Sequence, residues 1–188
     1  LRATHDTKLI SADHILKGGT VDGKIVIFDD EHYYMGSVIA ERLRDQGHAV
    51  TLVTPSTMVA EWTENTLEQR RIQQCLLEKG VEVICTHALT SIGDGEITLT
   101  CEYTGKARRI AADTVIPVTT RKPHCEVYNA LMAKADVWAE FGIKSVTRIA
   151  DCNAPGTIAM AVYAGHQYAR ELECTVADIP FKRENYLP

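Results

Sequence analysis

The sequence has 188 residues, 45% of them hydrophobic, and a formal net charge of -5 at pH 7. This length allows one domain or two small ones with a buried core, and the 20 Lys and Arg residues are scattered, which argues against a nucleic-acid site. No apolar run approaches the roughly 20 residues of a membrane span and the first residues lack the layout of a signal peptide, so we expect a cytoplasmic globular protein that binds neither membrane nor nucleic acid.

The first segment, residues 1–19, is mostly polar and is expected to be a connector. It contains one short helical pattern over 11–17. The pattern begins at Ser11, a residue type that favours helix N-caps, and ends at Gly18 and Gly19.

A β–α–β unit is the first strong pattern of the chain. Residues 24–29 (KIVIFD) form a continuous apolar run of strand length, and residues 49–54 (AVTLVT) form a second one. Between them, Ile39 and Leu43 share one helical face before Gly47 ends the helix. Both strands are apolar throughout and the crossover is short, which predicts a parallel sheet buried on both faces.

The next predicted elements are a helix over 65–79 and a short strand over 81–85. Asn65 and Glu68 stand at the spacing of a capping box, and Gly80 is the expected C-terminal stop.

An antiparallel meander is predicted next, because the pattern changes to strict alternation interrupted by two glycine-containing turns. Its strands cover residues 88–92, 97–103 and 107–111. Such a meander can serve as the crossover to a further parallel strand over 114–118. Pro117 lacks a ladder donor and should therefore lie at the end or edge of that strand.

The last third of the chain predicts two helices with a strand between them. The first helix should end near Gly142, the strand covers 145–150, and the second helix covers 155–172. The inner face of the first helix holds Val127, Leu131, Ala135 and Trp138. Residues 175–188 form a tail without periodicity, which should wrap over a surface or be disordered.

The predicted fold class is α/β, with a Rossmann-like parallel sheet and an antiparallel β-meander crossover. This order of elements is typical of flavoprotein disulfide-reductase-like modules, which nest an NAD-type domain inside a FAD-type domain. Residues 20–120 then form the NAD-type domain, and residues 121–174 form the returning segment of the FAD- or ADP-type domain.

Three stretches sharpen this assignment: GKIVIFDDEHYYMGSVIAERLRDQGHAVTLVTP, WTENTLEQ and SVTRIADCNAPGTIAMAVYAGHQYARELE. They resemble the C-terminal third of the trimethylamine dehydrogenase-like branch of the NADH:flavin oxidoreductases. The resemblance covers residues 20 to about 174. This branch includes dimethylamine and histamine dehydrogenases and the N-methylproline and dimethylglycine demethylases, with 2,4-dienoyl-CoA reductases as more distant members.

The resemblance implies a larger parent protein whose chemistry lies upstream of this chain. Relatives place an FMN-bearing barrel and a [4Fe–4S] cluster before this region, and the outer nucleotide domain holds ADP or FAD. Substrate amines are oxidatively demethylated or deaminated, and electrons pass to an electron-transfer flavoprotein. We therefore expect a homo-oligomeric parent, and a chain that has neither a complete cofactor site nor catalytic residues of its own.

The first β–α turn is where a dinucleotide fold places three glycines, which let the backbone approach a pyrophosphate at the helix N-terminus. Counted from the strand end, the three positions hold Asp29, Glu31 and Tyr34. Counted back from Gly36, they hold Glu31, Tyr33 and Gly36. Neither register supplies the glycines, so the turn is a degenerate nucleotide turn.

Charge points the same way. Asp29, Asp30 and Glu31 are consecutive acids, and each would repel a pyrophosphate by roughly 1 kcal/mol per close pair. The second strand ends in Thr54-Pro55, without the acid that usually holds ribose hydroxyls. We therefore expect an NAD-type fold that does not bind NAD. The alternative is a solvated acidic turn of some other α/β protein.

The second candidate site follows the predicted strand 145–150. A strand-end acid in this class bonds ribose or ribitol hydroxyls, and the next helix start faces the phosphates. The resemblance assigns these roles to Asp151, Pro155, Gly156 and Thr157, although Ala150 stands where glycine is usual. The alternative is that Asp151 only N-caps the last helix.

The remaining candidates are weaker. His32, Tyr33 and Tyr34 either plug the empty nucleotide cleft or are ordinary surface side chains. The six cysteines are spread singly, without the CxxC pairs of metal sites, and are expected to be buried free thiols, with no metal bound.

Two other functions remain open from the sequence. The chain could be a complete NAD(P)H:flavin oxidoreductase module of the 2,4-dienoyl-CoA reductase type, which would bind nicotinamide. It could instead be a non-catalytic interaction platform whose cleft is filled by side chains and which docks an electron-transfer partner.

Overall fold

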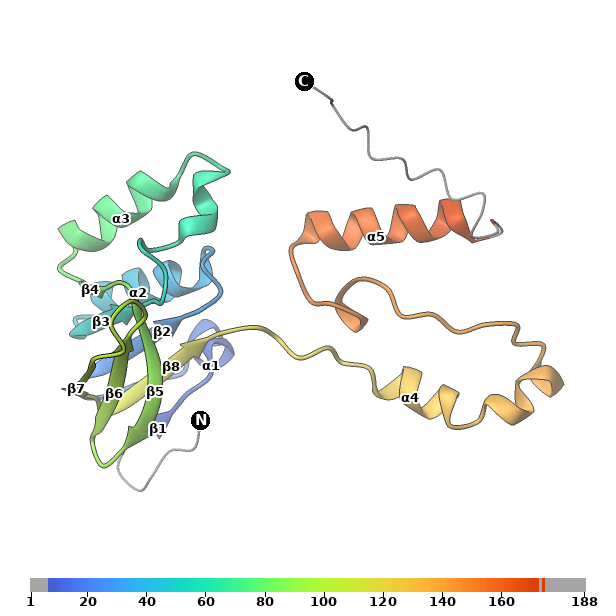
Figure 1. Ribbon diagram of the computed structural model, residues 1–188, viewed down its shortest axis with the longest axis horizontal. Coiled ribbons are helices and arrows are strands. Elements are labelled where there is room, and N and C mark those ends of the chain that lie inside the picture. The colour runs from blue at the N-terminus through green and yellow to red at the C-terminus, as the bar shows by residue number, and fades with distance from the viewer. Residues whose placement is uncertain (1–6, 173, 175–188) are drawn as a thin grey trace. The chain divides into compact units, whose positions relative to one another are not determined.

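The structure is a computed structural model that describes residues 7–172 and residue 174 (Figure 1). The described residues fall into two compact units, divided between Thr120 and Arg121. We call them unit 1 and unit 2. The tail expected over 175–188 lies outside the described residues.

Unit 1 is built on a five-stranded parallel sheet with the strand order β1-β8-β2-β3-β4. Its strands are β1 (Lys8–Leu9), β2 (Ile25–Asp29), β3 (Val50–Val53), β4 (Glu82–Ile84) and β8 (Thr114–Val118). A three-stranded antiparallel meander carries the chain from β4 to β8, as predicted. The meander consists of β5 (His87–Gly93), β6 (Glu96–Cys101) and β7 (Ala107–Ala111).

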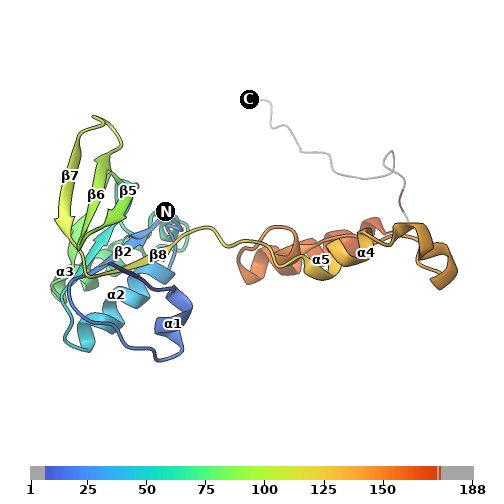
Figure 2. The ribbon, with the colours of Figure 1, turned by 90° about the horizontal axis from the view of Figure 1, so that it is seen from below.

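The sheet is covered on both faces, which explains why its strands are apolar throughout. Ile25 and Ile27 of β2 pack toward the helices, whereas Val26 and Phe28 pack toward the meander. Figure 2 shows the meander on one side of the sheet and the helices on the other. The helices are α1 (Ala12–Leu16), α2 (Met35–Asp45) and α3 (Gln69–Glu78).

The segment expected to be a connector, residues 1–19, supplies a helix and an edge strand to unit 1. The helix α1 forms as predicted, with the Ser11 side chain accepting from the N–H of His14. Ile15 is buried in the core, and β1, which the sequence did not predict, pairs with β8. A two-residue strand carries too little periodicity to be recognised.

Pro117 lies at a strand end, as expected. It is the last residue but one of β8 and stands opposite Phe28 of β2. On the other side of β8, the register of β1 covers only Thr114 and Val115. The missing donor of the proline therefore interrupts no ladder on that side.

The start of α3 differs from the prediction. Residues Glu61–Glu64 form a short 3-10 helix, η1, and α3 begins only at Gln69, because Leu67 takes a left-handed conformation (φ 62°). The capping box is wrong: Asn65 donates its side-chain amide to the carbonyl of Trp62, and Glu68 accepts from the hydroxyl of Tyr34.

Unit 2 contains α4 (Glu126–Met132), two 3-10 segments, η2 (Ala135–Phe141) and η3 (Ala150–Cys152), and α5 (Ile158–Glu171). The single helix expected up to Gly142 is therefore broken after α4, although it does stop at Gly142 (φ 69°).

The strand predicted over 145–150 does not form. A strand needs a neighbour for its backbone N–H and C=O groups, and the described part of unit 2 offers none. None of its described residues is buried. Several apolar side chains of α5 are largely exposed, namely Ile158, Met160, Val162 and Tyr163.

Hydrogen exchange should separate the two units. In a dilute solution of the chain we expect the amides of α5 to exchange roughly 100-fold or more faster than those of β2 and β3, because an unsupported helix of 14 residues is marginally stable. Equal protection of α5 and the sheet would show that unit 2 is complete by itself.

Candidate functional site

The turn between β2 and α2 lies at the carboxyl edge of the parallel sheet, where such folds bind their ligands. Its first residue, Asp29, ends β2 and is only 1% exposed. The Asp29 Oδ1 atom accepts from the backbone N–H groups of Glu31 and His32, both at 3.1 Å. Among the described residues, its Oδ2 atom is the single buried side-chain oxygen or nitrogen without a hydrogen-bond partner.

Gly36, in the first turn of α2, allows this carboxylate to lie where it does. A Cβ atom at position 36 would stand 2.5 Å from Asp29 Oδ2 and 2.7 Å from its Cγ. The glycine thus brings the helix backbone close to a carboxylate of the chain itself.

Burial raises the pKa of Asp29 to about 6, while the N–H groups of His32 and Glu31 oppose that shift. The group is therefore mostly ionised at neutral pH. A negative charge of the protein stands at the start of α2, in the kind of place where a dinucleotide fold binds phosphate.

His32 ties the turn to its neighbours. It takes a left-handed conformation (φ 62°), and its carbonyl accepts from the N–H of Trp62 at 2.9 Å. Its ring nitrogens lie 3.4 Å from Asp30 Oδ1 and 3.4 Å from Thr54 Oγ1, just beyond β3. The turn is thereby held against both β3 and the loop that leads to α3.

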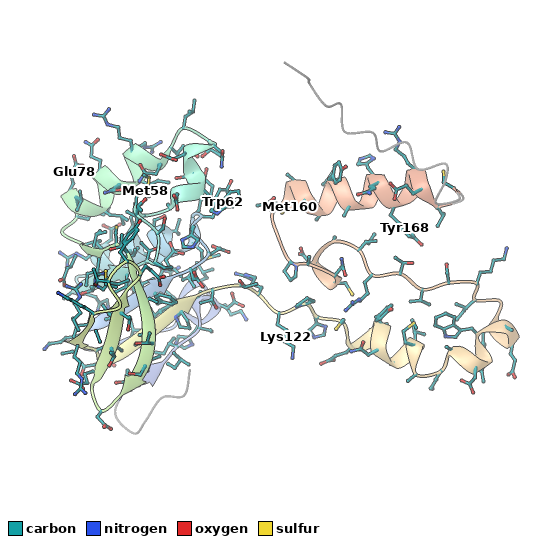
Figure 3. All side chains as sticks on the ribbon, viewed as in Figure 1. Met58, Trp62, Glu78, Lys122, Met160 and Tyr168 are labelled. Atoms are coloured by element: carbon teal, nitrogen blue, oxygen red, sulfur yellow. The ribbon has the colours of Figure 1, made fainter. Side chains whose placement is uncertain are left out.

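The tyrosines of the turn are half-buried, and Tyr34 reaches the residues just before α3. The rings of Tyr33 and Tyr34 lie 4.3 Å apart between centroids. The Tyr34 hydroxyl contacts Glu68 and lies 3.0 Å from Thr66 Oγ1, and the bond with Glu68 raises the pKa of Tyr34. The neighbouring Trp62, labelled in Figure 3, is 60% exposed.

From the sequence we expected Asp29 to form, with Asp30 and Glu31, an acidic surface that repels a pyrophosphate. In the structure Asp29 is not part of that surface. Asp29 is buried, whereas Asp30 is exposed and Glu31 is only partly covered. The burial of Asp29 could have been predicted from the alternation of side chains along a strand. Asp29 shares one side of β2 with Ile25 and Ile27, which face the helices, so alternation alone predicts that its side chain points at α2.

The second candidate site is open to solvent. Asp151 lies in η3, and its Oδ1 atom accepts from the N–H of Gly156 at 3.2 Å. The N-cap of α5 is Thr157, whose side chain accepts from the N–H of Met160. The alternative in which Asp151 caps this helix is therefore wrong. Asp151, Pro155, Gly156 and Thr157 do lie together at the start of α5.

The six cysteines are free, as expected, but none of them is fully buried. Five of them are partly exposed, and Cys174 is exposed. Within residues 7–172 and 174, no group of three or more His, Cys, Asp or Glu side chains could hold a metal ion. None of the helices in the same residues has the length and apolar composition needed to cross a membrane.

The buried Asp29 carboxylate in the turn between β2 and α2 leads to a binding prediction. NADH should not bind there, because the glycines are absent and Asp29 adds a negative charge. Calorimetric titration of the chain should give no dissociation constant tighter than about 1 mM, the range in which binding releases only about 4 kcal/mol. A micromolar constant that is lost on substituting Gly36 would contradict this prediction.

The chain is similar to known proteins over most of its length. Residues 10–132 match the model of the family described as the OYE-like second alpha/beta domain. The chain is 28% identical, over 94% of its length, to dimethylamine dehydrogenase of Hyphomicrobium sp. (strain x), of which it covers 27%.

Two solved structures are similar over most of the chain. Histamine dehydrogenase from Rhizobium sp. 4-9 superposes with a TM-score of 0.89 and 40% identity, covering 99% of this chain and 29% of that protein. The 6-hydroxypseudooxynicotine amine oxidase from Pseudomonas geniculata N1 gives a TM-score of 0.76 and 35% identity, covering 85% of this chain and 24% of that protein. The chain thus spans less than a third of the length of each relative.

Proposed function

The chain belongs to the OYE-like second alpha/beta domain family, and from this premise we propose that it is the nucleotide-domain portion of a flavin-dependent amine dehydrogenase. The observation that carries the proposal is the close superposition of nearly the whole chain on histamine dehydrogenase. Dimethylamine dehydrogenase, a second amine dehydrogenase, is similar over nearly the same length.

In this proposal the chain helps to bind a nucleotide and supports the fold of the larger protein, but none of its residues takes part in the oxidation of the amine. FMN and a [4Fe–4S] cluster, held by residues outside this sequence, supply the oxidation of a small amine and the exit of electrons to an electron-transfer flavoprotein. Unit 1 is a scaffold, because its nucleotide turn already contains the Asp29 carboxylate.

Unit 2 contributes half of a nucleotide site. Asp151 is exposed and can accept hydrogen bonds from the hydroxyls of a ribose, and its bond to the N–H of Gly156 holds the loop that precedes α5. The N-terminal end of α5, which begins after Thr157, can face the phosphates of ADP or FAD. The apolar face of α5 then packs on the domain that completes the site.

The proposal is tested on the full-length protein by releasing its bound nucleotides and counting them. We expect FMN together with ADP or FAD, and flavin reduction by an amine but not by NADH. Asp151→Ala should lower the ratio of the second nucleotide to FMN by about tenfold or more, which is the usual effect of losing a hydrogen bond to a charged group. Flavin reduction by NADH would instead favour the reductase alternative.

Asp136→Ala is the matched control, because Asp136 is also an exposed acid of unit 2 but lies in η2, away from the start of α5 in sequence. It should leave both nucleotides in place. An unchanged ratio in the Asp151 variant would remove Asp151 from the site without affecting the assignment to the amine dehydrogenases.

A docking role is the second candidate, and one observation favours it. Trp62 in η1 and Leu67, which follows η1, are 60% and 92% exposed, and η1 is bonded to the turn between β2 and α2 through His32. Exposed tryptophan is a frequent centre of protein interfaces. Trp62→Ala in the full-length protein should then slow electron transfer to a flavoprotein acceptor without changing reduction of FMN by the amine.

A further inference from the structure

The start of α2 lacks the groups that usually compensate a helix N-terminus. Its N-cap residue, Tyr34, makes no side-chain capping bond, and its first turn contains no acidic residue. A helix of 11 residues presents free N–H groups and a partial positive charge at this end. This end of the helix attracts a negative group from elsewhere in the chain and so offsets part of the cost of burying one.

Asp29 supplies that group from the end of the central strand. Its Oδ1 atom accepts two consecutive backbone N–H groups, those of Glu31 and His32, which is how phosphate-binding turns hold an oxyanion. Its Oδ2 atom is buried, without a hydrogen-bond partner among the described residues, and points at Gly36 within the first turn of α2. The carboxylate is thus enclosed between strand and helix.

We propose that this turn is an anion-binding site that the protein fills with its own Asp29 carboxylate. The side chain stands in for the phosphate of a dinucleotide, and the site is closed because strand, turn and helix are built around it. The role of Gly36 follows: it makes room for the carboxylate of Asp29. This inference concerns the turn alone, and it holds whether or not the parent protein oxidises amines.

The proposal predicts that a small carboxylate can replace the missing side chain. Asp29→Ala leaves a space the size of formate, lined by the free N–H groups of Glu31 and His32. Hydrogen exchange of these two amides in the full-length protein is the measurement, because it reports the turn directly and does not depend on enzymatic activity.

We expect the two amides to exchange about tenfold faster in Asp29→Ala, as for the loss of a hydrogen bond, and formate to restore slow exchange where chloride at equal ionic strength does not. Asp29→Asn is the matched control. Its amide oxygen still accepts both N–H groups and its side chain fills the space, so formate should have no effect on it or on the wild-type protein.

Two results would overturn the proposal. One is slow exchange of both amides in Asp29→Ala without any added anion. The other is an equal response to formate and chloride. Should Asp29→Ala fail to fold, Gly36→Ala serves instead, because its methyl group overlaps the Asp29 carboxylate and must displace it. Exchange should then be fast with or without formate, and unchanged exchange would refute the arrangement.

Discussion

Leu76→Ala is expected to lower the free energy of unfolding of unit 1 by about 2–5 kcal/mol, the usual cost of removing a fully buried leucine side chain. Leu76 is 0% exposed and packs from α3 into the cluster between the helices and the sheet. Urea unfolding followed by the fluorescence of Trp62 is the measurement. It is made in a Trp138→Phe background, because the chain has only these two tryptophans and Trp138 lies in unit 2.

The next residue of the same helix provides the control. Leu77 is 55% exposed, so Leu77→Ala removes the same atoms from a largely solvated position. Its effect should stay within about 0.5 kcal/mol, as for most surface substitutions. Equal losses for the two variants would mean that α3 does not pack on the sheet through Leu76.

Asp29→Asn should gain stability relative to the wild-type protein as the pH rises from 4 to 7. The pKa of Asp29 rises from 3.8 to about 6 on folding, so the folded state binds this proton more tightly than the unfolded state. The associated stability is fully present below pH 4 and is lost as the pH rises through 6. Over that interval the loss is on the order of 2–3 kcal/mol. The amide carries no charge and escapes this loss.

The measurement compares urea unfolding of the two proteins between pH 4 and pH 8. The difference in free energy of unfolding should grow up to about pH 7 and then stay constant, since other carboxylates contribute equally to both proteins. Asp22→Asn is the control, because Asp22 is an exposed acid of the same unit, and its effect should remain within about 0.5 kcal/mol throughout. A difference that does not change with pH would show that Asp29 is solvated.

The sheet of unit 1 was predictable because its signals are local. A run such as 24–29 is apolar at every position, and it becomes a strand buried on both faces whichever neighbours it obtains. The meander was recognisable from its alternation and its glycine turns. The strand β1 was not, because two residues in a polar segment form a strand only when β8 is already in place.

Unit 2 shows the opposite case. The residues 145–150 have the composition of a strand, yet without a neighbouring strand in the described chain they stay irregular. Strand formation is decided by pairing partners, and partners lie outside any sequence window. The helix α5 does form, because its hydrogen bonds are internal and Thr157 caps its start.

The sequence by itself determined the α/β class, the meander crossover, the family resemblance and the absence of a glycine-rich phosphate turn. Only the tertiary structure decided which of the three consecutive acids is buried against the start of α2. Three acids in a row look alike in a sequence, but long-range packing of β2 against α2 buries Asp29 and leaves Asp30 at the surface. Burial changes the pKa of one of these acids, because desolvation depends on what surrounds a carboxylate and not on its neighbours along the chain.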